Sequence, residues 1–246
     1  MPDWLTRTPE EHIQYDVDVL FGAWPSHPTD TDAAGLRAHL SRSHIRHALA
    51  ISTRGALFDA ASGNAETIAA AGDGLVPVGT VDLRDAVGAG EQLDALVEQG
   101  VRCLRLFTVQ QGAHGDTPSY RAVVAAAIER GMVLLQDGDP RVFGGLLAGR
   151  GAEVVFLDLH GYLLGDFLLM AKGEPGFRAT TRMLSSPDGI ERVVGSVGAE
   201  HLVFGSRTPL MDVSPQTLRL RYARITPEER ALIAGGNVQK MLEKLR

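Results

Sequence analysis

Short runs of apolar and β-branched residues alternate along the chain with longer segments in which apolar residues recur every three or four positions. The first pattern is typical of buried strands and the second of amphipathic helices. Their regular alternation predicts an α/β protein built on a parallel sheet. The predicted strands are Tyr15–Leu20, Ala48–Ser52, Val76–Thr80, Cys103–Phe107, Met132–Gln136, Val154–Leu159, Phe177–Arg182 and Leu202–Gly205.

Eight such strands fit a closed barrel better than an open sheet. The expected fold is a (β/α)₈, TIM-barrel-like fold, compact and partly distorted around the seventh strand, whose pattern is the least regular. Helix starts are expected at Thr117-Pro118, Ser186-Pro187 and Thr226-Pro227, and Asp139 is expected to cap a further helix. The chain has no long linker and no internal repeat, so residues 1–246 are expected to form one domain.

Composition narrows the class of function. The 246 residues carry a net charge of −6 without a block of like charge, so binding to nucleic acid is not expected. The single cysteine, Cys103, excludes an internal disulfide and a cysteine-based zinc site. The first residues are polar and acidic, unlike a signal peptide. The longest apolar stretch, Val154–Met170, is interrupted by charged residues, so no membrane association is expected. We expect a cytoplasmic protein.

Functional groups of a parallel barrel cluster at the C-terminal ends of its strands. The predicted register places a mixed set of carboxylates and arginines there, including Asp18, Arg105, Asp158 and Arg207. A hydrolytic zinc site needs three or four histidine or carboxylate ligands that converge on one point. This chain offers Asp18, Asp158 and His160 at most.

Several segments, in the same order along the chain, resemble the amidohydrolase-related (amidohydrolase 2 type) family of metal-dependent hydrolases and decarboxylases. Residues 16–22 are similar to the opening Asp-x-His-x-His segment of that family, and residues 134–138 and 156–161 to two strands that end in His-x-Gly. Residues 204–209 resemble its Phe-Gly-Ser-Asp-x-Pro signature, and residues 235–242 its closing Gly-Asn helix start. The resemblance implies a barrel that hydrolyses C–N or C–O bonds, or decarboxylates a small organic acid.

The metal-ligand positions of that family are degenerate in this chain. The first two histidines fall on Asp18 and Leu20, and the third falls on Gln136. A fourth falls on Leu159, one residue before His160. The metal-binding aspartate falls on Arg207. A leucine cannot bind a metal, and the permanent positive charge of an arginine repels a dication. The sequence therefore predicts a barrel without the usual metal and without another cofactor, in which Arg207 takes the place of the ion and pairs with Asp18.

Two functions remain open at this point. The protein is either a metal-independent enzyme of the hydrolase type or a catalytically inactive relative that binds a ligand or a partner subunit. A third hypothesis, zinc or manganese held by Asp18, Asp158 and His160, also stays open. The candidate partners are an anionic small molecule, a second copy of the chain and an active relative. The candidate catalytic residues are Asp18, Asp158, His160 and Arg207, and the candidate substrate-binding residues are Arg54, Arg105, Gln136 and Ser206.

Overall fold

The computed structural model describes residues 13–25, 27–57 and 59–245, which contain a nine-stranded sheet. Eight strands are parallel neighbours in chain order, and β2 pairs antiparallel with the end of β1 at the edge of the sheet. The strands are β1 (Ile13–Trp24), β2 (His27–Thr31), β3 (Ile45–Ser52), β4 (Leu75–Gly79), β5 (Cys103–Leu106), β6 (Val133–Gln136), β7 (Val154–Phe156), β8 (Phe177–Thr180) and β9 (Leu202–Val203).

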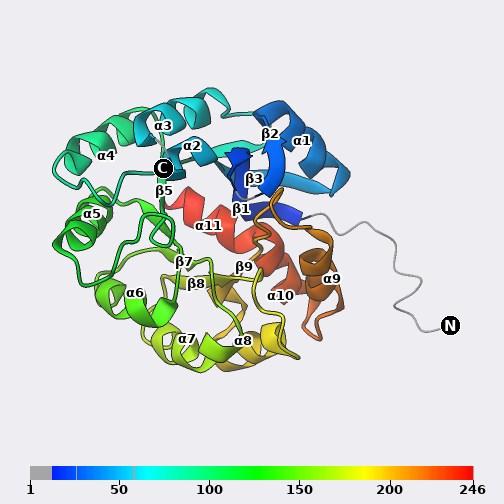
Figure 1. Cartoon of the computed structure of the whole chain (residues 1–246). Coiled ribbons are helices and arrows are strands. Elements are labelled where there is room, and N and C mark those ends of the chain that lie inside the picture. Colours follow the sequence, from blue (N-terminus) through cyan, green and yellow to red (C-terminus); the bar gives the residue numbers. More distant parts are fainter. Residues whose placement is uncertain (1–12, 26, 58, 246) are drawn as a thin grey trace.

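The parallel strands close into a barrel through the segment that follows β9. The backbone N–H of Val17 on β1 donates to the carbonyl of Phe204 at 3.1 Å, and the N–H of Leu20 donates to Thr208 at 2.9 Å. Helices surround the strands as a ring in Figure 1. The predicted (β/α)₈ architecture is thereby confirmed, with short later strands and a closure made by a loop as its distortion.

Helices fill the connections between the strands. They are α1 (Ala33–Arg42), α2 (Thr53–Leu57), α3 (Ala60–Ala69), α4 (Ala89–Glu98), α5 (Pro118–Glu129), α6 (Pro140–Leu147), α7 (Leu164–Ala171), α8 (Gly189–Val197), α9 (Ser214–Tyr222), α10 (Pro227–Ala231) and α11 (Asn237–Glu243). The predicted caps at Thr117, Asp139 and Thr226 are confirmed, and Thr226 forms a complete capping box with Glu229. The start predicted at Ser186-Pro187 is wrong, because Asp188 is left-handed, at φ 56°, and α8 begins after it.

Two apolar clusters lie on the two faces of the sheet. One fills the barrel interior with alternate residues of the strands, among them Val17, Leu49, Leu135 and Val203, and the other packs the outer face against the helices. Val238 and Met241 of α11 belong to the interior cluster. A cavity of about 790 Å³ lies between α11 and the first residues of β1, β3, β4 and β5. Helix α11 therefore covers the N-terminal end of the barrel, which leaves the opposite end as the mouth.

The edge strand β2 is not part of the predicted pattern. Its sequence, His27–Thr31, is polar and contains Pro28, and it carries no alternation that would indicate a strand. It forms because β1 continues to Trp24, beyond its predicted end, and offers a free edge. A proline is tolerated on an edge strand, where one backbone side is unpaired. Among the described residues, none of the helices has the length and apolar composition that crossing a bilayer requires.

Candidate functional site at the mouth of the barrel

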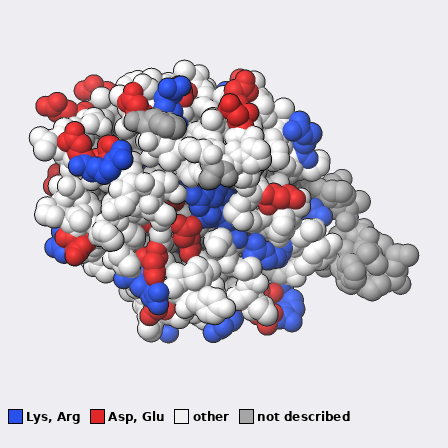
Figure 2. All heavy atoms as spheres, in the orientation of Figure 1, with Lys and Arg blue, Asp and Glu red and all other residues white. Residues whose placement is uncertain are grey.

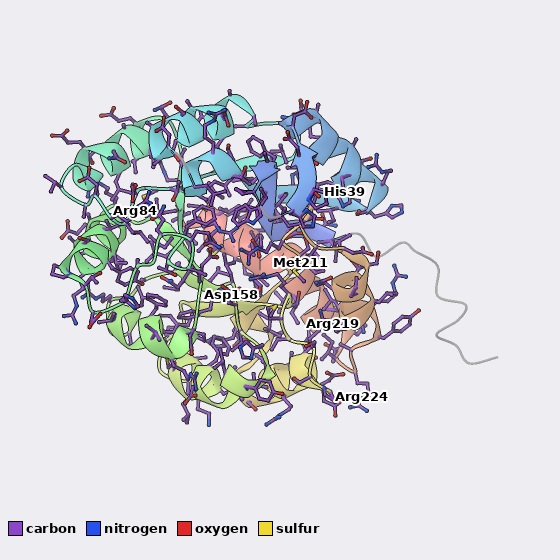
Figure 3. All side chains as sticks on the ribbon, viewed as in Figure 1. His39, Arg84, Asp158, Met211, Arg219 and Arg224 are labelled. Atoms are coloured by element: carbon purple, nitrogen blue, oxygen red, sulfur yellow. The ribbon has the colours of Figure 1, made fainter. Side chains whose placement is uncertain are left out.

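Six charged side chains of alternating sign lie in a row across the mouth. They come from β1 and β5 and from the residues that follow β6, β7, β8 and β9. In Figure 2, acidic and basic side chains gather over the centre of the ring of helices, and in Figure 3 Asp158 lies near that centre. We call this row the charge network. Its members in order of contact are Asp137, Arg105, Asp18, Arg182, Asp158 and Arg207.

Arg105 contacts two buried carboxylates, those of Asp18 and Asp137, and we call these three residues the floor of the site. Its Nη1 donates to Oδ1 of Asp18 at 2.7 Å and its Nη2 donates to Oδ1 of Asp137 at 2.9 Å. All three side chains are at most 1% exposed. The guanidinium also lies 4.7 Å from the ring centroid of Phe107, which adds a cation–π contact. A buried cation is stable only when it is paired in this way.

Arg182 continues the network toward solvent. Its Nε lies 3.0 Å from Oδ2 of Asp18, although neither atom has a hydrogen bond of acceptable geometry, and its Nη2 donates to Oδ1 of Asp158 and to the carbonyl of Leu157. The other oxygen of Asp158 accepts from the backbone N–H of Gly138 at 2.7 Å. Both carboxylate oxygens of Asp158 therefore already accept a hydrogen bond from the protein. Arg182, the last residue of the seventh predicted strand, is missing from the predicted site residues, and the pattern of that strand is the least regular of the eight.

In both Asp18 and Asp137, burial raises the pKa of the carboxyl group and the neighbouring arginines lower it. Burial alone would raise the pKa of Asp18, but the positive charges of Arg105, Arg182 and Arg207 outweigh it and lower that pKa. Burial raises the pKa of Asp137, and its single arginine partner does not compensate. Asp137 Oδ2 also has no hydrogen-bond partner among the described residues. Asp18 is thus held as a carboxylate, whereas Asp137 is the carboxyl group of the floor that takes up a proton more readily.

Ser206, a predicted substrate-binding residue, belongs instead to a closed buried contact beside the network. Its hydroxyl donates to Oδ2 of Asp16 at 2.5 Å, and its backbone N–H donates to Oδ1 at 3.1 Å. Both residues are 0% exposed. Burial raises the pKa of Asp16 to about 7 despite these hydrogen bonds. The pair ties β1 to the segment after β9 and presents no group to the mouth.

Gln136 lies on the opposite face of the sheet from the predicted site. Its Oε1 accepts a hydrogen bond from the hydroxyl of Tyr120 on α5 at 2.7 Å, and the residue is 0% exposed. Val133 and Leu135 point into the barrel, so the residue between Leu135 and Asp137 must point outward. The prediction that Gln136 binds substrate is therefore wrong, and Asp137 is the residue of this strand end that faces the site.

The predicted ion pair between Arg207 and Asp18 is also wrong. The described side chains within 4 Å of the Asp18 carboxylate that carry positive charge are those of Arg105 and Arg182. Arg207 instead points its Nη1 toward Oδ1 of Asp158, at 3.8 Å. Arg207 meets Asp18 through its backbone, where its N–H donates to the Asp18 carbonyl at 2.7 Å. The space between the carboxylates is filled by Arg105 and Arg182, which come from the middle of the chain.

Among the described residues, neither His160 nor Arg54 forms an ion pair with a member of the charge network. The ring of His160 contacts Tyr162 edge to face at 5.8 Å between centroids. The guanidinium of Arg54 lies 2.6 Å from Glu66, and both side chains are about half exposed. Arg54 and Glu66 line a separate cavity of about 770 Å³ between α1, α3 and the ends of β1 and β3.

The donor set at the mouth does not fit a divalent ion. The described residues contain no group of three histidine, cysteine, aspartate or glutamate side chains that could hold one. Leu20 is buried in the apolar barrel interior, and three guanidinium groups contact the carboxylates that would have to bind the ion. A dication beside these cations would be strongly repelled.

Solved structures show which proteins share this fold. An uncharacterised TIM-barrel protein from Bordetella bronchiseptica superposes with a TM-score of 0.73 at 15% identity, over 94% of this chain and 99% of the other. The 2,6-dihydroxybenzoate decarboxylase from Rhizobium gives 0.70 at 14% identity, over 94% and 99%. The 5-carboxyvanillate decarboxylase from Sphingomonas paucimobilis gives 0.69 at 14% identity, over 94% and 98%.

These likenesses establish the TIM-barrel fold over nearly the whole chain. They agree, at the level of the fold, with the family resemblance of the sequence motifs. A comparison with protein-family models gives no match, and neither does a comparison with curated protein sequences.

Proposed function

We propose that this protein is an amidohydrolase-related barrel, of the hydrolase and decarboxylase lineage, that acts on or binds a small organic acid at its mouth without a divalent metal ion. Two of the structural neighbours are named as decarboxylases of aromatic acids, which supports the lineage. The ordered sequence motifs support it independently. Fold alone does not assign a substrate, so the class of ligand is argued from the site.

The observation that carries the proposal is the convergence of three arginines on the mouth. Guanidinium groups bind carboxylates through paired, charge-assisted hydrogen bonds. Arg105 and Arg182 neutralise the aspartates of the floor, and Arg207, 17% exposed, is the arginine of the network that a ligand can reach. An organic acid is the ligand class that this arrangement fits, and the arginines supply in place of a metal the positive charge that holds it.

A second candidate, a ligand-binding protein without catalytic activity, is favoured by the state of the acid–base candidates. Asp18 lies between two arginines, and both oxygens of Asp158 are engaged. A carboxylate held in this way is a weak base. His160, the third candidate, packs its ring against Tyr162 and forms no ion pair with the network among the described residues. If the protein is an enzyme, Asp18, Asp158 or His160 must nevertheless move the proton, with Arg207 holding the acid and Arg105 balancing the buried aspartates behind it.

The remaining assignments are part of the same proposal. We place the protein in the cytoplasm, since its one cysteine is free and buried. Its partner is a small anionic molecule, and association with a second copy or with an active relative is compatible with the barrel. Neither nucleic acid nor a membrane is proposed as a partner.

The test is binding of a panel of small carboxylic acids, measured by titration calorimetry before and after dialysis against a chelator, with elemental analysis of the purified protein. We expect binding that the chelator leaves unchanged and a metal content far below one ion per chain. A stoichiometric ion whose removal abolishes binding would overturn the metal-free assignment. Mass spectrometry of each incubated acid then separates turnover from binding alone.

A further inference from the structure

Arginines stand at or just after the ends of several parallel strands, and most of them contact a carboxylate closely. Arg54 lies 2.6 Å from Glu66, Arg84 2.7 Å from Asp82 and Arg141 2.7 Å from Asp139. Within the charge network, Arg105 and Arg182 each contact two aspartates. The charges of these five arginines are therefore balanced by the protein itself.

Arg207 differs from these five arginines. Its carboxylate contact is Asp158 at 3.8 Å, beyond hydrogen-bond distance, and Asp158 is already engaged by Arg182 and Gly138. The guanidinium carbon lies 6.0 Å from the ring centroid of Trp24, at the outer limit of a cation–π contact. Arg207 thus carries a positive charge at the mouth that the described side chains balance only weakly.

The backbone of Arg207 is held firmly although its side chain is not. The residue has φ 65°, in the left-handed region, which costs about 1 kcal/mol or more for a residue other than glycine. Its N–H donates to Asp18, and its carbonyl accepts from Leu210 at 3.0 Å and Met211 at 3.3 Å. A strained backbone that is fixed by three hydrogen bonds aims the side chain, and strain of this kind is common at binding sites.

We infer that Arg207 sets the ligand specificity of the mouth for a single carboxylate: the site takes a small monocarboxylic acid whose acid group binds Arg207 and whose uncharged remainder lies against Trp24. The inference rests on the proposed function and deepens it. A second carboxylate on the ligand would lie either beside Trp24, which offers it no positive charge, or beside Asp158, which repels it, so it would be desolvated without a cationic partner.

Arg219 is another arginine that could bind a second acid group, because one of its nitrogens is buried without a partner among the described residues. Its side chain donates to the backbone carbonyls of Pro215 and Arg182, and its Nη1 is buried without a partner among the described residues. It belongs to α9, and Figure 3 shows it away from Asp158 toward the rim of the barrel. Preferential binding of dicarboxylates would therefore point to Arg219 and against the single-carboxylate site.

The test measures the dissociation constants of benzoate, terephthalate and benzamide for the full chain and for Arg207→Gln, Arg207→Lys and Arg84→Gln. We expect benzoate to bind at least about tenfold more tightly than either other probe. Arg207→Gln should weaken benzoate by at least about tenfold, Arg207→Lys less, because lysine keeps the charge but loses the planar fork. Arg84→Gln, the matched arginine of an exposed pair, should leave it unchanged.

The outcomes separate this inference from the proposed function. Terephthalate that binds as tightly as benzoate, or benzoate binding that survives Arg207→Gln, overturns the inference while the acid-binding function stands. Failure of both acids to bind the wild-type chain overturns both. Thermal unfolding of each variant shows that a loss of binding does not come from a loss of fold, and Arg207→Lys gives the result if Arg207→Gln does not fold.

Discussion

Nη1 of Arg105 lies 2.7 Å from Oδ1 of Asp18, and this contact joins β5 to β1 across the mouth of the barrel. The two side chains are 1% and 0% exposed, so the pair is shielded from solvent. A second contact from the same guanidinium reaches Asp137 at the end of β6. One cation thereby links three strands, and its removal would leave two buried carboxylates facing each other.

Arg105→Met tests this structural role. The variant replaces the guanidinium by a shorter, uncharged side chain, which leaves Asp18 with one arginine fewer in contact and Asp137 with none. Removing one partner of a buried ion pair typically costs about 3–5 kcal/mol, and we expect the free energy of unfolding in urea to fall by that amount. Arg84→Met is the matched control, and the exposed pair with Asp82 should contribute less than about 1 kcal/mol. Equal losses in the two variants would contradict a structural role of the floor.

Asp16 predicts a pH dependence of stability. Its pKa is raised from 3.8 to about 7 by burial, so the folded state keeps a proton that the unfolded state has already released. The folded state binds more protons between these values, and its stability therefore decreases as pH rises from about 4 to about 7 and is level above.

Asp16→Asn should remove this slope, because an amide carries no titrating proton. Between pH 5 and pH 7, wild type should lose roughly 2–3 kcal/mol relative to the variant, at about 1.4 kcal/mol per unit of pKa. The measurement is urea unfolding at intervals of pH, with the difference between the two proteins as the readout, since Asp137 has a raised pKa and contributes the same slope to both. Parallel curves for the two proteins would show that Asp16 titrates normally.

Tyr120→Phe tests the placement of Gln136. The change removes the hydroxyl that donates to Gln136 Oε1 and leaves that buried acceptor unsatisfied, which costs about 1–3 kcal/mol. Because this contact lies between the sheet and α5, the affinity for an organic acid should stay as in wild type. A large loss of affinity at unchanged stability would return Gln136 to the binding site.

The sequence predicts the barrel well because its signals are local. The alternation of apolar residues, the caps at Thr117 and Thr226 and the order of the strands all arise within a few neighbouring positions. The edge strand β2 has no such signal, since its polar residues become a strand only through pairing with the extended β1.

The site is predicted less completely because the direction of a side chain depends on register. Asp18, Asp158 and Arg207 lie at the mouth as expected, but the prediction for Gln136 rests on a motif position rather than on the period of two that turns Asp137 inward. Arg182 is missed because it belongs to the seventh predicted strand, whose pattern is the least regular, and the structure ends β8 two residues earlier, at Thr180. The partners of Asp18 likewise come from strands distant in sequence, which no local pattern shows.

Asp158→Asn tests whether the negative charge of Asp158 weakens the binding of an acid at Arg207. Asp158 lies 3.8 Å from Nη1 of Arg207 and so competes with an incoming carboxylate for that guanidinium. Two like unit charges about 4 Å apart at an intermediate dielectric constant repel by about 4 kcal/mol, which is an upper bound for Asp158 and a ligand carboxylate at Arg207. Asp158 is 23% exposed, which screens much of it.

Removal of this charge should tighten benzoate binding by about tenfold, equivalent to about 1.4 kcal/mol. The asparagine oxygen can still accept from Arg182, whereas the N–H of Gly138 loses its acceptor, so thermal unfolding of the variant must show that the fold is retained. Calorimetric titration of the variant at low and at high salt is the measurement, and the gain should be smaller at high salt because screening already weakens the repulsion in wild type. If affinity falls instead, Asp158 acts by positioning the guanidinium of Arg207 for the ligand, and the idea that its charge competes with the ligand is wrong.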